Sequence, residues 1–171
     1  MGNIYLDPRP GKLHGFLKDI REERPIENAT IVVTGNSALS SSDGEFVIDA
    51  EVGKQKLMIY HPDFETLVLD IEVEVNSYHE LGDICLSPKP GIVIGSTVPG
   101  RSTIRFYGKY ENYSIVSDEN GDFIIHEIIP DTYLAEISCE GYYTKTRKNI
   151  IILSGDITDM GITVLEPEVG N

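Results

Sequence analysis

The chain has 171 residues, of which 40% are hydrophobic, with 16 glycines and 9 prolines. This length and composition fit one medium or two small globular domains and exclude a disordered chain. The formal net charge is −14 and is spread evenly: residues 1–89 carry 8 basic and 16 acidic side chains, and residues 90–171 carry 6 and 12. Acidity of this size repels phosphate backbones and anionic lipid surfaces, so we expect neither nucleic acid nor a membrane as partner.

The first predicted segment is an N-terminal arm at residues 1–11. Its run Asp7-Pro8-Arg9-Pro10 disfavours regular structure, because proline fixes its own backbone and restricts the residue before it. The arm has neither the basic region nor the apolar run of a secretory signal peptide, and the apolar stretches of the chain are too short to span a membrane. We therefore expect synthesis in the cytoplasm, and incorporation into a virion or a phage-like particle fits this expectation.

Residues 12–89 predict a first domain of short strands separated by turns. A long strand over residues 66–76 alternates between two faces. Its apolar face would hold Leu67, Leu69, Ile71, Val73 and Val75. Its acidic face would hold Asp70, Glu72 and Glu74. Because exposed carboxylates in a row suit a basic partner, these three acidic residues are candidate interaction residues.

The run Pro88-Lys89-Pro90-Gly91 predicts a short, semi-rigid linker, and residues 90–167 then repeat the pattern of the first domain. Residues 168–171 form a C-terminal tail. Three landmarks recur in the same order: Thr30–Gly35 and Thr103–Gly108, Ser42–Phe46 and Glu119–Phe123, and Leu81–Pro88 and Met160–Pro167. The repeat predicts that Phe46 and Phe123 occupy equivalent buried positions, each after a hairpin turn that contains Asp43-Gly44 or Asn120-Gly121.

These motifs resemble the carboxypeptidase regulatory-like family of prealbumin-like β-sandwiches. In the first domain the resemblance rests on Gly15–Asp19, Arg24–Val33, Asp43–Phe46 and Asp63–Thr66, and in the second on Asn120–Phe123, Ile129–Tyr133 and Gly141–Tyr143. The resemblance implies two tandem seven-stranded antiparallel β-sandwiches of the prealbumin-like or immunoglobulin-like type, without catalytic residues. The sequence itself agrees with an all-β fold with almost no helix, because no stretch sustains a period of 3.6 residues.

Metal and cofactor sites are not expected. Cys85 and Cys139 lie in apolar strand patterns without a neighbouring cysteine or histidine, which predicts buried free thiols and no zinc site. The acidic run at residues 118–122 is too short in ligands for a calcium loop and is typical of a turn. No nucleophile motif is present, so we expect that the protein is not an enzyme and takes no cofactor. An isopeptide crosslink from Lys12 or Lys18 to Asp83 is suggested only by analogy with related pilin modules and is not favoured.

Tyrosine is the one unevenly distributed residue type, with most of the 9 tyrosines in the second domain. Tyr107, Tyr110 and Tyr113 fall on one predicted hairpin. Rings with a polar end at such a place suit contacts with protein or sugar, so these tyrosines are candidate interaction residues. Packing of the same rings against neighbouring strands is an equally good interpretation.

The sequence favours a non-catalytic structural or adaptor protein of a larger assembly, with a phage virion or phage-tail-like particle as one such assembly. It would bind protein partners, further copies of itself included, through sandwich loops and edges, with the second domain as the main contact and the first as spacer or second contact. Two alternatives stay open. One is a carbohydrate-binding or cell-surface adhesion module, and the other is an accessory domain of an enzyme or transporter.

Overall fold

The structure is a computed structural model, and it describes residues 9–169. These residues form fourteen strands and no helix, which confirms the all-β fold class. None of them belongs to a helix that could span a membrane. The chain divides into two compact units, Met1–Ser87 (unit 1) and Pro88–Asn171 (unit 2). The predicted arm lies outside the described residues up to position 8, and its last residue, Gly11, already belongs to the first strand.

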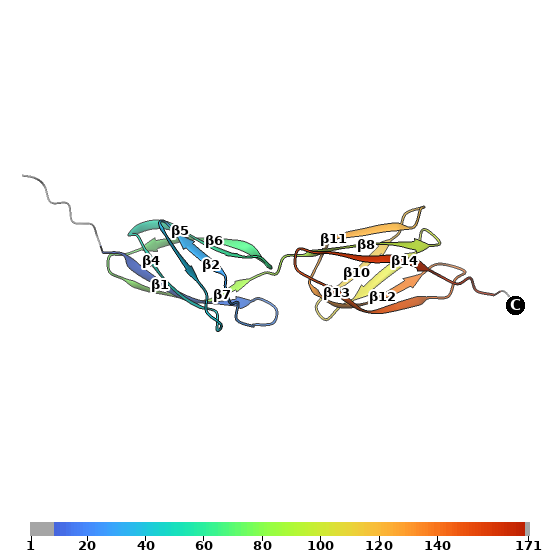
Figure 1. The fold of residues 1–171 in the computed structure, drawn as a ribbon, viewed down its shortest axis with the longest axis horizontal. Coiled ribbons are helices and arrows are strands. Elements are labelled where there is room, and N and C mark those ends of the chain that lie inside the picture. Colours follow the sequence, from blue (N-terminus) through green and yellow to red (C-terminus); the bar gives the residue numbers. More distant parts are fainter. Residues whose placement is uncertain (1–8, 170–171) are drawn as a thin grey trace, which may run out of the picture. The chain divides into compact units, whose positions relative to one another are not determined.

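Unit 1 is a sandwich of two sheets, whose layers can be followed in Figure 1. The three-stranded sheet holds, in spatial order, β4 (Glu45–Ala50), β1 (Gly11–Asp19) and β7 (Tyr78–Leu86). The four-stranded sheet holds β3 (Asn36–Leu39), β2 (Thr30–Val33), β5 (Gly53–His61) and β6 (Phe64–Val73).

Unit 2 repeats this topology strand by strand. Its three-stranded sheet holds β11 (Asp122–Ile128), β8 (Gly91–Val98) and β14 (Ile157–Val164). Its four-stranded sheet holds β10 (Asn112–Val116), β9 (Thr103–Tyr107), β12 (Asp131–Ser138) and β13 (Lys145–Ile152). The sequence repeat is therefore a repeat of the whole seven-stranded arrangement.

Each unit contains one parallel pair in addition to the predicted antiparallel ones. The first and last strands of a unit, β1 with β7 and β8 with β14, pair in parallel. A parallel pair needs a long connection, and here the other five strands of the unit supply it. Both pairs shift register at the same place, close to a glycine with positive φ, Gly82 at 67° and Gly161 at 62°.

Each unit has a hydrophobic core of its own, built from inward-facing strand residues. Phe46 and Phe123 are only 2% and 7% exposed, as the repeat predicts. Each ring lies against a glycine of the unit's first strand. A Cβ atom added at Gly15 would lie 3.0 Å from Phe46, and one at Gly95 would lie 2.8 Å from Phe123. The two phenylalanines are thus equivalent in burial and in contact.

The turns at Asp43-Gly44 and Asn120-Gly121 are tight, but they are not hairpins within one sheet. The first connects β3 to β4 and the second connects β10 to β11, and each of these pairs belongs to two different sheets. The Gly44 amide donates to the Ser41 carbonyl at 2.9 Å. An Asp-Gly pair marks the reversal of the chain but does not specify which sheet the next strand joins.

Two further expectations are wrong in detail. The long strand β6 ends at Val73, and Val75 is 59% exposed instead of lying on the core face. Cys85 is exposed, because the core of unit 1 takes its neighbours Ile84 and Leu86, and strand alternation then turns Cys85 outward. Cys139 is half-buried and packs against the core of unit 2, and both cysteines are free thiols.

Candidate interaction surfaces

The three candidate tyrosines lie on the β9–β10 hairpin, but they do not form one surface. Tyr107 is 41% exposed on the outer face of the sheet, where it pairs with Leu134 of β12. Tyr110 is exposed at the hairpin tip, where the Lys109 ammonium donates to its hydroxyl at 2.6 Å. The tip is held in place because the Lys109 amide also donates to an Asp131 carboxylate oxygen at 2.6 Å.

Tyr113 points inward. It lies opposite the buried Phe106, and its ring contacts that of Tyr133 edge to face at 6.0 Å between centroids. The Ile129 amide donates to the Tyr113 hydroxyl at 3.1 Å, and the Tyr133 hydroxyl donates to the Ile129 carbonyl at 2.9 Å. Burial raises the pKa of both phenols above the ordinary value. Tyr113 therefore holds the chain before β12 in place, and its side chain is only partly exposed.

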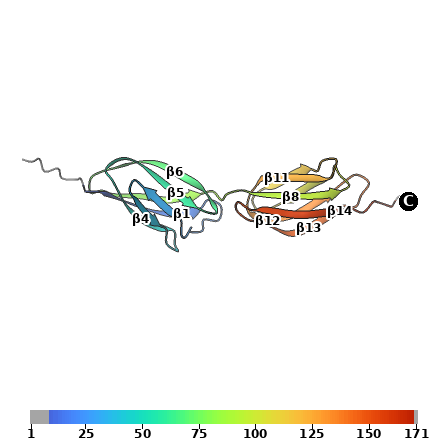
Figure 2. The same cartoon turned by 45° about the horizontal axis from the view of Figure 1, so that its top comes forward.

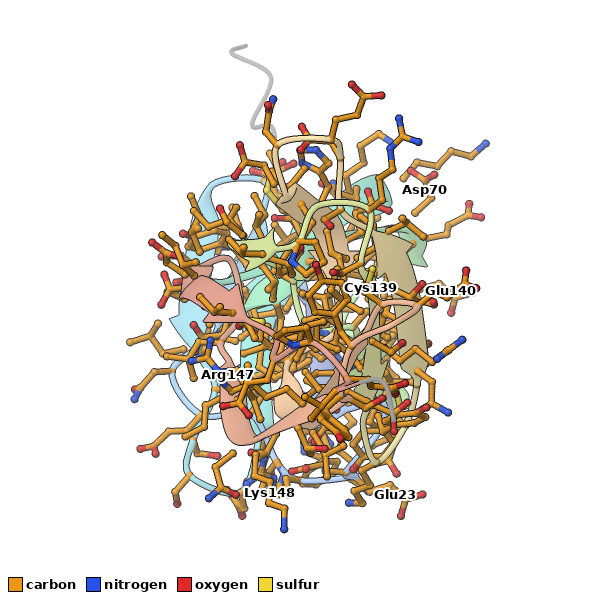
Figure 3. All side chains as sticks on the ribbon, turned by 90° about the vertical axis from the view of Figure 1, so that its right-hand side faces the viewer. Glu23, Asp70, Cys139, Glu140, Arg147 and Lys148 are labelled. Carbon is orange, nitrogen blue, oxygen red and sulfur yellow. The ribbon has the colours of Figure 1, made fainter. Side chains whose placement is uncertain are left out.

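The three acidic candidates are also divided. Asp70 and Glu72 lie on the exposed outer face of β6, and Figure 3 labels Asp70. Glu74 follows the end of β6 and belongs to the turn before β7, where the Ser77 hydroxyl donates to its carbonyl at 2.7 Å.

The acidic face is balanced by lysines from the neighbouring strand. The Lys56 ammonium contacts the Asp70 carboxylate at 2.7 Å, and Lys54 lies directly opposite Glu72 in the register of β5 with β6. An open depression of about 460 Å³ is lined by these four side chains together with Gln55 and Ile71. Acidic and basic side chains therefore alternate across β5 and β6. The purely acidic surface expected from the sequence of β6 alone is not present there.

The outer face of β1 carries a row of basic side chains, which includes the Lys12 and Lys18 named above as possible crosslink donors to Asp83. Lys12 contacts Asp49 at 2.7 Å and Lys18 contacts Asp83 at 2.6 Å. Between them lies His14, a largely buried side chain. Lys12, His14 and Lys18 of β1 thus contact carboxylates on the two neighbouring strands, β4 and β7. Only the pairing of β1 with β4 and β7 reveals them, because the partners are at least 31 positions away in the chain.

His14 bridges two glutamates. Its Nδ1 lies 2.7 Å from Glu80 of β7 and its Nε2 lies 2.8 Å from Glu45 of β4. The hydrogen bonds to Glu80 and Glu45 raise the pKa of His14 above 6.5, against the opposing effect of burial. Because a carboxylate contacts each ring nitrogen, the protonated imidazole connects β1 to both β4 and β7. We call this arrangement the His14 clasp.

Lys18 and Asp83 form an exposed ion pair. Their side chains are 34% and 54% exposed, and the hydrogen bond to Asp83 raises the pKa of Lys18. Among residues 9–169, no three histidine, cysteine, aspartate or glutamate side chains are grouped so that they could hold a metal ion.

A broad apolar surface lies on the outer face of β11, β8 and β14 in unit 2, three strands that Figure 2 shows side by side. We call it the aliphatic face, and its members are Ile92, Ile94, Val98, Ile124, Ile157, Ile162 and Val164. All are β-branched. Ile157 and Ile162 are 64% and 71% exposed, so the face is open to solvent. The sequence hints at it, because Ile92, Val93 and Ile94 are apolar on both sides of the strand.

Unit 1 has a smaller apolar surface on its other sheet. Val32, Met58 and Val68 lie in one register across β2, β5 and β6, and all three are exposed. Leu39 and Tyr60 extend this surface on either side of Thr30. We call these five side chains the apolar row.

No protein-family model matches the sequence, and no curated protein matches it either. Among solved structures, the TIE protein of Bacillus anthracis is similar at 15% identity and a TM-score of 0.53, over 93% of this chain and 34% of that one. A streptococcal ancillary pilin is similar at 12% identity and a TM-score of 0.42, over 96% of this chain and 64% of that one. The chain thus spans about a third and just under two thirds of these proteins. The similarity to the TIE protein supports the all-β sandwich fold. The narrower resemblance to the carboxypeptidase regulatory-like family stays a prediction.

Proposed function

We propose that the protein is a non-catalytic structural or adaptor component of a larger protein assembly. The observation that carries this proposal is the aliphatic face of unit 2. Soluble monomers seldom leave a contiguous apolar surface of this kind in water, and such surfaces commonly mark sites of protein contact. A sheet face is also rigid, so little conformational entropy is lost when a partner covers it.

The polar clusters support binding more than catalysis. Lys12 with Asp49, Lys18 with Asp83, and His14 with its two glutamates satisfy one another on a sheet face. Charges that are already paired have little capacity to act on a substrate. Their arrangement stabilises the sheet, and we assign no reaction to them.

The kind of assembly is part of the proposal. A phage virion or a phage-tail-like particle fits a chain of two sandwich units that offers sheet faces for contact. A display fibre on a cell surface fits the same features. The two kinds of assembly can be distinguished by fractionation. Particles and cell envelopes are isolated from the source, and the fraction that contains this chain identifies the assembly.

A carbohydrate-binding role remains the second candidate, because Tyr107 and Tyr110 are exposed on one hairpin. Exposed aromatic rings can stack on sugars, since they offer a flat apolar surface. A glycan array with the intact chain, and with Tyr107 and Tyr110 both changed to alanine, tests this role directly.

The test of the assembly role compares three sets of substitutions in the tagged full chain, expressed in its source and recovered with its crosslinked partners. Ile157→Lys with Ile162→Lys should abolish recovery of partners, because it places two charges on the aliphatic face. Tyr107→Ala with Tyr110→Ala, and Asp70→Lys with Glu72→Lys, should leave recovery intact.

The matched control is Tyr78→Lys, which changes an exposed residue at the position of unit 1 that corresponds to Ile157. Loss of partners with the tyrosine or the acidic set, and not with the isoleucine set, would move the contact to those residues. Unchanged recovery with all three sets would remove the support for an assembly role.

A further inference from the structure

We propose that the aliphatic face of unit 2 in one copy of the chain binds the apolar row of unit 1 in a second copy, head to tail. This inference rests on the proposed function and names the partner of the same surface. Because the two units share one topology, each outer-face position of unit 1 can be matched to a position of unit 2 through the strand registers.

The fold does not require the aliphatic face. In unit 1 the positions that correspond to Ile92 and Ile94 are held by Lys12 and His14. Further along the same two strands, the counterparts of Val98 and Ile162 are Lys18 and Asp83. At these four positions unit 1 carries charged or histidine side chains where unit 2 carries β-branched aliphatic ones. The counterparts of Ile124 and Ile157 in unit 1, Val47 and Tyr78, are exposed and uncharged.

The four-stranded sheets show the reverse pattern. The register of β9, β12 and β13 matches Val32, Met58 and Val68 of unit 1 to Arg105, Glu136 and Thr146 of unit 2. Arg105 and Glu136 form an ion pair at 3.7 Å. At the matched positions the apolar side chains therefore lie on different sheets in the two units. Other exposed apolar side chains, such as Val116 and Ile151 in unit 2, lie outside these positions.

The charges beside the two surfaces indicate which surfaces pair. Asp122 and Asp159 share the aliphatic face, where they lie opposite Ser96 and Ile94. Against a second aliphatic face these carboxylates would lose water without gaining a cation, which is costly. Next to the apolar row, β5 presents Lys54 and Lys56 on its outer side, where Lys56 pairs with Asp70 and Lys54 lies opposite Glu72. An ammonium group has three donors, so each lysine can bond a second carboxylate as well. The apolar row with its lysines is therefore the surface that complements the aliphatic face, and every copy of the chain carries it.

The contact would join two different surfaces, so it is heterologous. Each copy would offer one surface of each kind, and such contacts build open chains or closed rings. A protein that associates in this way extends an assembly by repeating itself, which agrees with a structural role.

The test uses two variants of the full chain and sedimentation velocity over a range of concentrations. Variant A carries Ile157→Lys and Ile162→Lys, and variant B carries Met58→Lys and Val68→Lys. The unchanged chain should form dimers and larger species as its concentration rises. Each variant alone should associate at least about 30-fold more weakly, because charged substitutions at the centre of a contact remove most of its affinity.

Mixing the variants gives the decisive measurement. Variant A keeps an intact apolar row and variant B keeps an intact aliphatic face, so a mixture should form dimers with one copy of each and nothing larger. Tyr78→Lys and Thr146→Lys are the matched controls at the equivalent positions of the other unit, and they should associate like the unchanged chain. All substituted side chains lie on outer sheet faces, and circular dichroism verifies that each variant is folded.

Three outcomes would overturn the inference. The unchanged chain could stay monomeric at concentrations up to about 1 mM, the weak limit of a specific contact. Association could survive in variant A or in variant B, or the mixture could fail to form the mixed dimer. If the chain is monomeric alone but still loses its partners through Ile157→Lys with Ile162→Lys in the source, the head-to-tail contact is wrong while the proposed function stands.

Discussion

The alternation of a strand decides which tyrosines of the β9–β10 hairpin can reach a partner. Tyr107 and Phe106 are neighbours in β9, so they point to opposite faces. Tyr113 lies opposite Phe106 in the register and shares its inward direction. Two tyrosines six positions apart therefore differ: Tyr107 is exposed on the outer face, and Tyr113 supports the interior.

Tyr113→Phe should destabilise unit 2, whereas Tyr107→Phe should not. The first change removes the hydroxyl that accepts the Ile129 amide at 3.1 Å, and the loss of such a part-buried hydrogen bond costs about 1 kcal/mol. The free energy of unfolding from urea titrations measures both changes. Equal losses for the two variants would mean that the Tyr113 hydroxyl does not hold Ile129.

The His14 clasp gives unit 1 a pH dependence whose sign can be stated. A histidine whose folded-state pKa is raised contributes stability that is fully present below the unfolded value of 6.5 and is lost as pH rises through the raised pKa. The charged groups that face the ring are Glu45 from β4 and Glu80 from β7, with Lys12 on the same face of β1.

An NMR titration of the His14 ring in the full chain should therefore give a pKa above 6.5. Glu80→Gln should lower that pKa, because the hydrogen bond to Glu80 is the largest cause of the shift. A His14 pKa at or below 6.5, or no response to Glu80→Gln, would contradict the clasp.

At the scale of the element, the glycine turns join the two sheets of each sandwich. Gly44 has φ +80° and Gly121 has φ +95°, a backbone region that glycine enters without strain. Both also touch the first strand of their unit. An added Cβ would lie 2.4 Å from the Leu17 carbonyl oxygen at Gly44, and 2.0 Å from the Thr97 carbonyl oxygen at Gly121.

Gly121→Ala should cost clearly more than Gly155→Ala. Gly155 also has positive φ, at +70°, but an added Cβ there would meet no atom within 4 Å. Its substitution carries only the backbone strain of about 1–2 kcal/mol, whereas at Gly121 the clash with Thr97 adds to a similar strain. Denaturant unfolding of the two variants gives the comparison, and similar costs would show that the turn moves away from β8 easily.

The landmarks of the repeat and the alternation of β6 predict the strands, the two units and the burial of Phe46 and Phe123, because period and turn chemistry are local properties. The parallel pair of β1 with β7 and the membership of β4 in the other sheet depend on contacts between distant residues. For the same reason the sequence does not reveal that Lys54 and Lys56 balance the acids of β6. The outward direction of Cys85, in contrast, follows from its local alternation with Ile84 and Leu86.

At the scale of the whole molecule, the two units share core contacts but differ in the side chains on their outer sheet faces. Gly15 with Phe46 and Gly95 with Phe123 repeat the same internal contact. The outer faces differ, since Lys12, His14 and Lys18 in unit 1 stand where unit 2 has Ile92, Ile94 and Val98. Core positions are fixed by packing, whereas outer positions are free to serve different contacts.

The separate cores lead to a last prediction. Phe46→Ala and Phe123→Ala should each lower the stability of one unit by about 3–5 kcal/mol, because each removes a buried ring and leaves a cavity. Each core contains residues of a single unit only, so the loss should be local. Hydrogen exchange of the full chain, read strand by strand, measures it: Phe46→Ala should speed exchange in β1 to β7 and Phe123→Ala in β8 to β14. Val47→Ala is the control in the first unit, since Val47 lies next to Phe46 but is 45% exposed and should change exchange little. If Phe46→Ala accelerates exchange equally in all fourteen strands, the two cores unfold as one, and the division of stability between the units is wrong.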